Sequence, residues 1–246
     1  MTTTGTGARP AFYALAAGGW RDYVTLLHLP YTIWHLSYVA IGAALASHLR
    51  WGLLGLTVLA FALAMGIGAH ALDELHGRPL ETRVPARVLA VAAALSIAAA
   101  AAIGIAVAAR EDWWLLAFVG VGAAVVVAYN LELAGGLFHG DLWFALDWGA
   151  FPVVTAYFAQ THTVRWDAAA AAAFAALASY AQRVLSTQVR DVRRRVVAVT
   201  GTILLRDGRI ESLDAHALTA PAERALKTLA ASLAALAGAL LLLHVV

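Results

Sequence analysis

Cysteine is absent from the 246 residues, so neither a disulfide nor a thiolate takes part in the structure or chemistry of this protein. Charge is also scarce, because Asp, Glu, Lys and Arg together make up 13% of the chain while hydrophobic residues make up 62%. A soluble globular domain carries about 25% charged residues. Together with a mean hydropathy of +0.75, this composition excludes the soluble globular class and predicts a membrane protein.

Several signatures of catalysis and nucleotide binding are missing as well. The chain has no Walker loop, no dinucleotide-binding glycine fingerprint and no serine nucleophile elbow. Its basic residues form no DNA- or RNA-binding motif and lie beside apolar runs, so we do not expect nucleic acid as a partner. Carboxylates, histidines and arginines therefore remain as the candidates for a functional site.

Apolar runs near the 20 residues needed to cross a bilayer recur along the whole chain. We expect them to be helices, because lipid offers no partner to unpaired backbone groups. Stretches such as AVAAALSIAAAAAIGIAVAA favour close helix packing, although a genomic alanine bias would leave the same pattern. The predicted fold is all-α, a single-domain polytopic transmembrane helix bundle over residues 1–246. About seven spans are predicted, at residues 24–48, 51–72, 86–109, 113–131, 142–161, 167–187 and 226–246.

Lys and Arg are distributed unevenly among the connections between these spans. If the spans alternate in direction, Arg50, Arg110 and Arg165 fall on one side of the membrane and every other Lys and Arg falls on the other. The positive-inside rule then predicts a multi-pass cell-membrane protein with its N-terminus and functional site in the cytoplasm and its C-terminus outside. A basic face of this kind suits anionic membrane lipid or an anionic substrate.

Two regions outside the spans carry predictions of their own. Residues 1–20 lack the charged region, apolar core and cleavage site of a signal peptide, and we expect a short disordered N-terminal tail there. Residues 188–225 form the longest connection, in which β-branched residues flank Asp207 and Gly208. This pattern predicts a small hairpin or flap over the cytoplasmic helix ends. A plain surface loop is the alternative.

Two clusters of ionisable residues stand at helix ends on the predicted cytoplasmic side. In the sequence AHALDELHGRPLETR, a helix that continues to residue 77 would place His70, Asp73 and Glu74 on one face. In STQVRDVRRR, at the end of the sixth span, Gln188 and Asp191 share a face in the same way. The arginines beside the two clusters are Arg78, Arg83, Arg190, Arg194 and Arg195. Each polar residue alone could be an interfacial anchor, but two such clusters on one side favour a site.

The order of these elements resembles the UbiA superfamily of intramembrane prenyltransferases. Members of that family carry two aspartate-rich motifs, at the ends of the second and sixth helices, and the two clusters described above occupy these places. The segments LLHLPYTIWHLSYVAIGAALA and GDLWFALDWGAFPVVTAYFAQT are similar to the family's first-helix and fifth-helix regions. The resemblance covers about residues 22–195 and is carried by four separate segments in the family's order.

The resemblance implies an enzyme that transfers an isoprenoid chain from a prenyl diphosphate to a lipophilic or aromatic acceptor. Asp73 and Asp191 match acids of the two motifs and are expected to be catalytic. With Glu74 they are also the expected ligands of Mg²⁺, a hard cation that takes oxygen ligands. An alternative on the same scaffold is a membrane terpene cyclase, and a further alternative is a protein without catalytic activity that binds a lipid or a quinone.

The chain departs from the family pattern at three motif positions. Ala69 and Gly77 stand where the family has an asparagine and an aspartate, and Arg195 stands at the second aspartate of the second motif. Because carboxylates are lost, we expect one magnesium ion rather than two, with arginines holding phosphate oxygens in their place. The chain is also two helices short of the family's nine, so a homo-oligomer that supplies the missing helices is an open alternative.

Three further polar residues complete the predicted site. Tyr129 and Asn130 end the fourth span, where family members often have a tyrosine near the diphosphate. Asp147 lies within WFALDWGAF, where an ionised carboxylate at mid-membrane would cost about 2.5–3.5 kcal/mol, so it should face the bundle interior with His35 as a candidate partner. The predicted substrate-binding residues are His70, Arg78, Arg83, Tyr129, Asn130, Asp147, Gln188, Arg190, Arg194 and Arg195.

Overall fold

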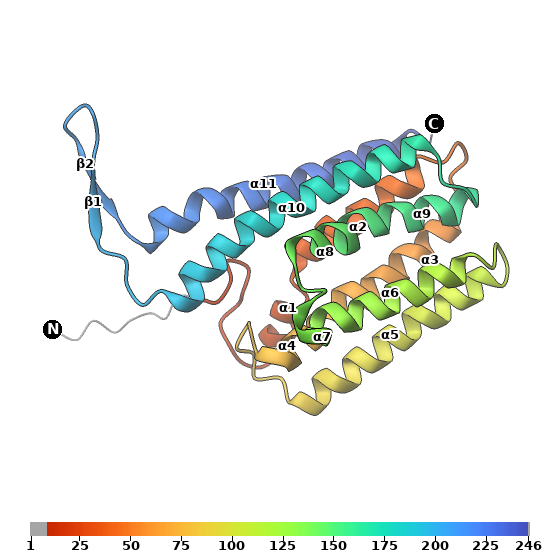
Figure 1. The fold of residues 1–246 in the computed structure, drawn as a ribbon, viewed down its shortest axis with the longest axis horizontal. Helices are drawn as coiled ribbons and strands as arrows, with labels where there is room; N and C mark the ends of the chain where they lie inside the picture. Colours follow the sequence, from red (N-terminus) through yellow and green to blue (C-terminus); the bar gives the residue numbers. More distant parts are fainter. Residues whose placement is uncertain (1–8, 246) are drawn as a thin grey trace.

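Long helices account for most of the computed structural model, which describes residues 9–245 (Figure 1). In chain order the elements are α1 (Trp20–Leu26), α2 (Leu29–Ala44), α3 (Trp51–Phe61), the π-helical η1 (Ala62–Ala69), α4 (His70–Gly77), α5 (Ala86–Ala108), α6 (Leu115–Asn130), α7 (Leu133–Gly136), α8 (Asp141–Ala145), the π-helical η2 (Leu146–Ala150), α9 (Phe151–Thr161), α10 (Trp166–Arg195), β1 (Gly201–Leu204), β2 (Ile210–Leu213) and α11 (Ala215–Leu242). The prediction of an all-α membrane-type bundle is confirmed.

Every predicted span coincides with a helix, but not all of these helices are long. Five are long and apolar enough to cross a membrane, namely Trp51–Gly77, Ala86–Ala108, Asp141–Thr161, Trp166–Arg195 and Ala215–Leu242. The first and fourth predicted spans correspond to α2 and α6, which have 16 residues each and run alongside the others. The structure therefore supports a membrane protein with five such helices within residues 9–245, where the sequence predicts about seven.

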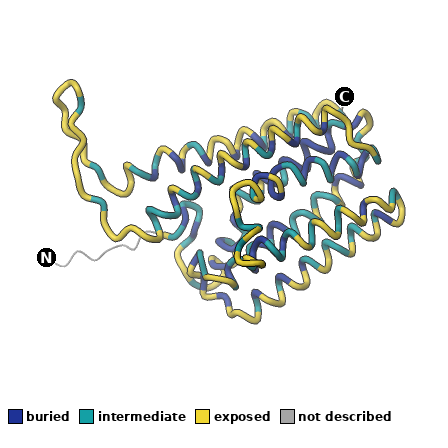
Figure 2. The backbone as a smooth tube through the Cα atoms, in the orientation of Figure 1, coloured by how far each residue is buried: buried dark blue, intermediate teal, exposed yellow. Residues whose placement is uncertain are grey.

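Small residues let the helices approach one another closely. A Cβ atom at Gly42 of α2 would overlap the backbone of Val153 in α9, and one at Gly149 of η2 would overlap the backbone of Ala175 in α10. Between apolar helices in lipid, close van der Waals packing replaces the hydrophobic driving force. Many large apolar side chains are exposed on the outer surface of the bundle. Figure 2 shows exposed residues along the outward sides of the long helices.

The helix that carries the first acidic cluster extends as far as predicted, but part of it is π-helical, which the sequence did not predict. Residues 66–77 continue as helix, as the prediction for the first acidic cluster requires, and the run Trp51–Gly77 is unbroken. Part of this run, η1, is π-helical, and so is η2, which lies within the run Asp141–Thr161. Such insertions in α-helices are frequent at functional sites.

The predicted long connection over residues 188–225 is shorter in the structure. Helix α10 continues to Arg195 and α11 begins at Ala215, which leaves residues 196–214 as the connection. The predicted hairpin is present, with β1 and β2 antiparallel and Leu204 opposite Ile210. Figure 1 shows the hairpin projecting beyond the ends of α10 and α11, so it is not a flap over the helix ends.

Part of the predicted N-terminal tail is packed against the bundle. Residues 1–8 lie outside the described residues, but Ala11 and Ala14 are buried. The Arg9 guanidinium donates to the carbonyl of Ala14 at 3.2 Å, and the Leu15 N–H donates to the Thr25 hydroxyl at 2.9 Å. Residues 9–19 are therefore an ordered segment and not a disordered tail, because their apolar side chains and backbone groups find partners on α1 and the loop around residue 80.

Candidate functional site

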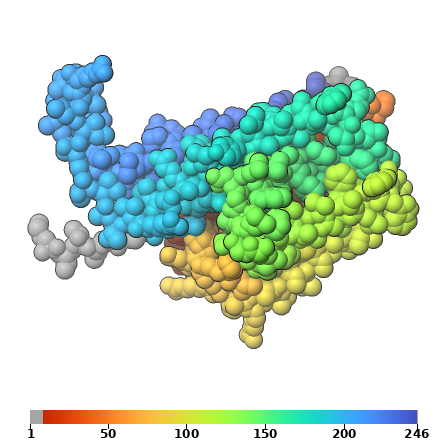
Figure 3. All heavy atoms as spheres, in the orientation of Figure 1, coloured from red at the N-terminus to blue at the C-terminus, as the bar shows by residue number. Residues whose placement is uncertain are grey.

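A cavity of about 590 Å³ lies at the end of the bundle where α4 and α10 end. Its walls come from the N-terminal segment, α2, α4, α6, α8 and α10, and Figure 3 shows the α4 and α10 surfaces next to one another. We call it the polar cavity. Both predicted acidic clusters contribute to it. The predicted site residues that line it are His70, Asp73, Tyr129, Asn130, Arg190, Asp191, Arg194 and Arg195.

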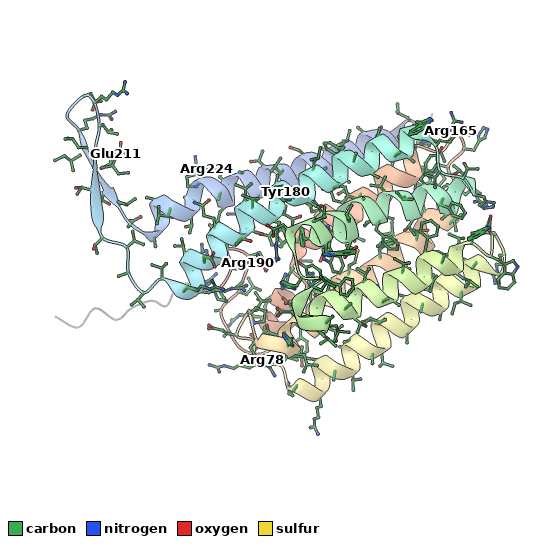
Figure 4. All side chains as sticks on the ribbon, viewed as in Figure 1. Arg78, Arg165, Tyr180, Arg190, Glu211 and Arg224 are labelled. Carbon is green, nitrogen blue, oxygen red and sulfur yellow. The ribbon has the colours of Figure 1, made fainter. Side chains whose placement is uncertain are left out.

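Arginines dominate the α10 wall of the polar cavity. Arg190, which Figure 4 labels on α10, donates to the Thr187 hydroxyl at 2.8 Å, and Arg194 donates to the Pro10 carbonyl at 3.4 Å. Neither forms an ion pair with an acid within residues 9–245. Arg195 does form one, with Asp191 at 3.3 Å. Two guanidinium groups therefore keep donors for an anionic ligand.

Arg183, which the sequence analysis missed, belongs to the same wall. Its guanidinium lies 5.4 Å from the Phe144 ring centre and forms an ion pair with Asp141 at 3.2 Å. Across the cavity Asp73 is half-buried, and its carboxyl lies within electrostatic reach of Arg190 and Arg194. Four arginines and four acids line the cavity. Arg183 and Arg195 are paired with Asp141 and Asp191, which leaves Arg190 and Arg194 as arginines without an acid partner among the described residues.

Three residues that line the polar cavity each have a buried polar atom without a hydrogen-bond partner. The atoms are His28 Nε2, Tyr129 OH and Gln182 Oε1, and all three residues line it. A buried polar atom left unpaired costs about 1–3 kcal/mol. A ligand or water that offers both donors and acceptors would recover this free energy, which makes the cavity a candidate binding site for a polar group.

His28 and Gln182 were also missed from the sequence. His28 stacks on His70 with ring centres 3.9 Å apart, its Nδ1 is 3.0 Å from the Tyr13 hydroxyl, and its φ of 45° is the left-handed conformation that non-glycine residues seldom adopt. Burial raises the pKa of Tyr13 well above its ordinary value, so this hydroxyl stays protonated. Gln182 lies two helical turns before Arg190 on one face of α10, and this spacing was the signal available in the sequence.

Glu74 and Arg78 do not line the polar cavity, contrary to prediction. The fully buried Glu74 carboxylate accepts hydrogen bonds from the backbone N–H groups of Leu80 and Thr82, at 2.9 and 2.8 Å, and from the Thr82 hydroxyl at 2.8 Å. Arg78 donates to the carbonyls of Thr82 and Val84, at 3.2 and 2.6 Å. Both side chains therefore hold the loop between α4 and α5, which leaves Glu74 no free oxygen toward a metal ion in the cavity.

Arg83 and Gln188 are likewise outside the polar cavity. Arg83 is exposed, and only its backbone N–H is engaged, donating to the buried Asp22 at 2.9 Å. Gln188 is on the face of α10 that meets α11, where its amide is 3.5 Å from the Leu218 carbonyl. Asp191, which shares a helical face with Gln188 in the sequence, does line the cavity, so the shared face alone does not bring Gln188 into it.

Asp147 lines a different hollow, which is apolar and lies deeper in the bundle. The predicted His35 partner is wrong, because His35 Nδ1 is 2.8 Å from the Trp148 carbonyl oxygen and Asp147 Oδ2 has no partner. Met65 and Trp148 line both this hollow and the polar cavity, so they form the wall between the two.

The predicted set of magnesium ligands does not come together. Within residues 9–245 no group of three or more His, Asp or Glu side chains could hold a metal ion. Glu74 is committed to the α4–α5 loop and Asp191 to Arg195. A site built from protein ligands alone is therefore not formed, although magnesium often needs only one or two carboxylates when substrate phosphates supply other ligands.

Comparison with protein-family models, curated proteins and solved structures gave no match to this chain.

Proposed function

We propose that this protein is an intramembrane prenyltransferase of UbiA type, which binds a prenyl diphosphate in the polar cavity and transfers its isoprenoid chain to a lipophilic or aromatic acceptor. The observation that carries the proposal is the pair Arg190 and Arg194, two guanidinium groups without acid partners in a cavity at the end of membrane helices. Planar guanidinium groups match the oxygens of phosphates in a bidentate geometry.

The shape of the cavity favours an amphiphilic ligand over a free inorganic anion. Its arginines lie on the α10 wall, whereas Met65, Phe144 and Trp148 supply apolar surface on the side toward the membrane helices. An anionic head group would meet the arginines while an attached apolar chain would leave water. By the distribution of Lys and Arg, this end of the bundle faces the cytoplasm.

In the proposed reaction, the bond between C1 of the isoprenoid and the bridging diphosphate oxygen breaks, and its electron pair leaves with pyrophosphate. The allylic cation then forms a bond to the nucleophilic atom of the acceptor, which loses a proton. Arg190 and Arg194 would stabilise the charge that grows on the leaving group. Positioned donors of this kind lower the barrier because they need no reorientation as the charge develops.

Asp73 faces the same arginines, and its negative charge would oppose a bound diphosphate. One magnesium ion shared by Asp73 and phosphate oxygens is the proposed cofactor, and it would supply positive charge at the leaving group. Asp191 is less available for this role, since Arg195 neutralises it. We therefore expect Asp73→Asn to impair catalysis more than Asp191→Asn.

The first test is binding of a non-hydrolysable prenyl thiodiphosphate to the purified protein in lipid nanodiscs, with and without Mg²⁺. Arg190→Met should weaken binding about 10- to 100-fold, because a charge-assisted hydrogen bond contributes about 1.5–3 kcal/mol. Arg224→Met is the matched control, since Arg224 is exposed on α11 outside the cavity (Figure 4). Equal affinities of the two variants would refute the proposed head-group site.

The second test measures pyrophosphate release from prenyl diphosphates in the presence of candidate acceptors. Activity that persists in both Asp73→Ala and Asp191→Ala would refute the mechanism. A terpene hydrocarbon or alcohol formed without an acceptor would identify a cyclase instead. The Asp191–Arg195 ion pair favours a non-catalytic lipid-binding protein as the second candidate, and tight diphosphate binding without pyrophosphate release would support it.

A further inference from the structure

The apolar hollow that contains Asp147 is separate from the polar cavity. It has a volume of about 120 Å³ and lies between α3, η1, α5, α6, η2 and α9. Apolar side chains such as Phe61, Ile97 and Phe118 make up most of its walls. Leu56 also lines the hollow and is exposed, so the hollow opens to the lipid-facing surface of the bundle. We call it the lateral pocket. A cavity of about 150 Å³ holds a benzene molecule, so the lateral pocket encloses only part of a lipid-sized ligand.

Two buried polar atoms on one wall of the lateral pocket have no hydrogen-bond partner. They are Asp147 Oδ2 in η2 and Thr155 Oγ1 in α9, and both residues line the pocket. Asp147 is 9% exposed, and none of the ion pairs found between residues 9 and 245 involves it. At membrane depth no water is available in bulk to satisfy such atoms, and an ionisable residue there indicates a functional site.

Thr155 differs from other threonines in the helices of the bundle. The hydroxyls of Thr57 and Thr161 donate to the carbonyl four residues earlier, at 2.8 and 2.9 Å, which is how threonine satisfies itself within a helix. Thr57 lines the same pocket as Thr155. The free hydroxyl of Thr155 is therefore a feature of this position and not of threonines in this bundle generally.

The two atoms define a spacing along the wall. Asp147 and Thr155 are eight residues apart on one continuous helical run. At the α-helical rise of 1.5 Å per residue they would be about 12 Å apart along its axis, and the π-helical residues of η2 make this an upper value. Phe151, midway between them, presents an apolar ring to the same pocket. A complementary ligand would be apolar in its middle and polar at two positions.

We propose that the lateral pocket binds an uncharged, elongated apolar molecule that places a hydroxyl group at Asp147 and a second polar oxygen at Thr155. An anionic ligand is excluded because no cation among the described residues lines the pocket, and a hydroxyl group suits both side chains because it can donate to the Asp147 carboxyl and accept from the Thr155 hydroxyl. Binding at this pocket involves neither a diphosphate nor magnesium, so the inference stands whether or not the proposed function is correct.

The experiment uses the full-length protein in nanodiscs and an aliphatic alcohol that carries a photoreactive diazirine. Cross-linked peptides are mapped by mass spectrometry, and 1,8-octanediol, 1-octanol and octane are compared as competitors at equal membrane concentrations. The diol, whose oxygens are separated by about the distance between the two side chains, should compete best and octane worst. Thr155→Val should remove the advantage of the diol over 1-octanol, about 2- to 10-fold for one lost hydrogen bond.

Thr57→Val is the matched control, because it makes the same change in the same pocket to a hydroxyl that is already bonded. It should leave the order of the competitors unchanged. Asp147→Leu should abolish the preference of the pocket for alcohols over octane while raising the melting temperature of the ligand-free protein, since an unpaired buried carboxylate is replaced by an apolar side chain. Equal competition by octane and the diol, or equal effects of Thr57→Val and Thr155→Val, would overturn the proposal.

Discussion

Replacement of Glu74 by glutamine should destabilise the protein although no surface charge is involved. The carboxylate is fully buried and accepts three hydrogen bonds of 2.8–2.9 Å from the loop between α4 and α5. An amide of the same size would turn an N–H₂ group toward one of these donors. One unsatisfied buried donor and one lost charge-assisted bond together cost about 2–4 kcal/mol. For a chain of this size, that corresponds to a drop in melting temperature of roughly 4–16 °C.

The assay is thermal unfolding in detergent followed by tryptophan fluorescence, together with tryptic cleavage of the same loop at Arg78 and Arg83. Glu81→Gln is the matched control, since Glu81 is exposed on the same loop and should change stability by less than about 0.5 kcal/mol. Cleavage should be faster in Glu74→Gln than in Glu81→Gln because the loop has lost its anchor. If Glu74→Gln unfolds at the wild-type temperature yet loses magnesium-dependent binding of the diphosphate, Glu74 is a metal ligand and our assignment as a loop anchor is refuted.

Other perturbations test the bundle away from the site. Arg50→Met should lower stability by about 1–2 kcal/mol in the same melting assay. The half-exposed Arg50 pairs with Glu111 and donates to the Ala159 carbonyl, so it joins the α2–α3 and α5–α6 connections to the end of α9. An unchanged melting temperature would contradict this. Gly42→Ala should reduce the yield of monodisperse protein, because the added Cβ would overlap the Val153 backbone. Gly120→Ala is the control, since there is open space around Gly120, and it should leave the yield unchanged. Equal yields of the two variants would count against the close α2–α9 contact. Backbone and side-chain hydrogen bonds from Arg209 lower the pKa of Asp207. The stability that these bonds give the hairpin is therefore present above the ordinary Asp pKa of 3.8 and is lost as the pH falls through the lowered pKa. NMR titration of Asp207 should show this, and a midpoint at or above 3.8 would argue against it.

Much of the bundle could be predicted from the sequence because lipid imposes strict rules. Apolar runs had to be helical, and the seven predicted spans fall on helices in the structure. The turn pair Asp207-Gly208 was sufficient to predict the hairpin, since Gly208 adopts a φ of 85° that glycine tolerates. Helix ends were less predictable, and α11 begins 11 residues before the predicted span at residue 226, because polar residues such as Glu223 continue the helix beyond the apolar run.

The candidate site could also be predicted only in part. Helical spacing brought Asp73, Arg190 and Arg194 to the ends of α4 and α10, and the structure places all three around one cavity. The same spacing also selected Glu74, Arg78 and Gln188, which the structure turns toward a loop or a neighbouring helix. A periodic pattern shows roughly which residues share one face of a helix. It does not show whether a cavity, a loop or another helix packs against that face.

By itself, the sequence determined that this is a helical membrane protein with most of its Lys and Arg in alternate connections, since both properties depend on composition and local periodicity. Tertiary structure alone decided which polar atoms lack partners. His28, Gln182 and Thr155 do not stand out in the sequence, yet each lines a cavity and has a buried polar atom to which the surrounding helices present no complementary group. Hydrogen-bond satisfaction depends on contacts between distant segments, and such contacts exist only once the bundle has packed.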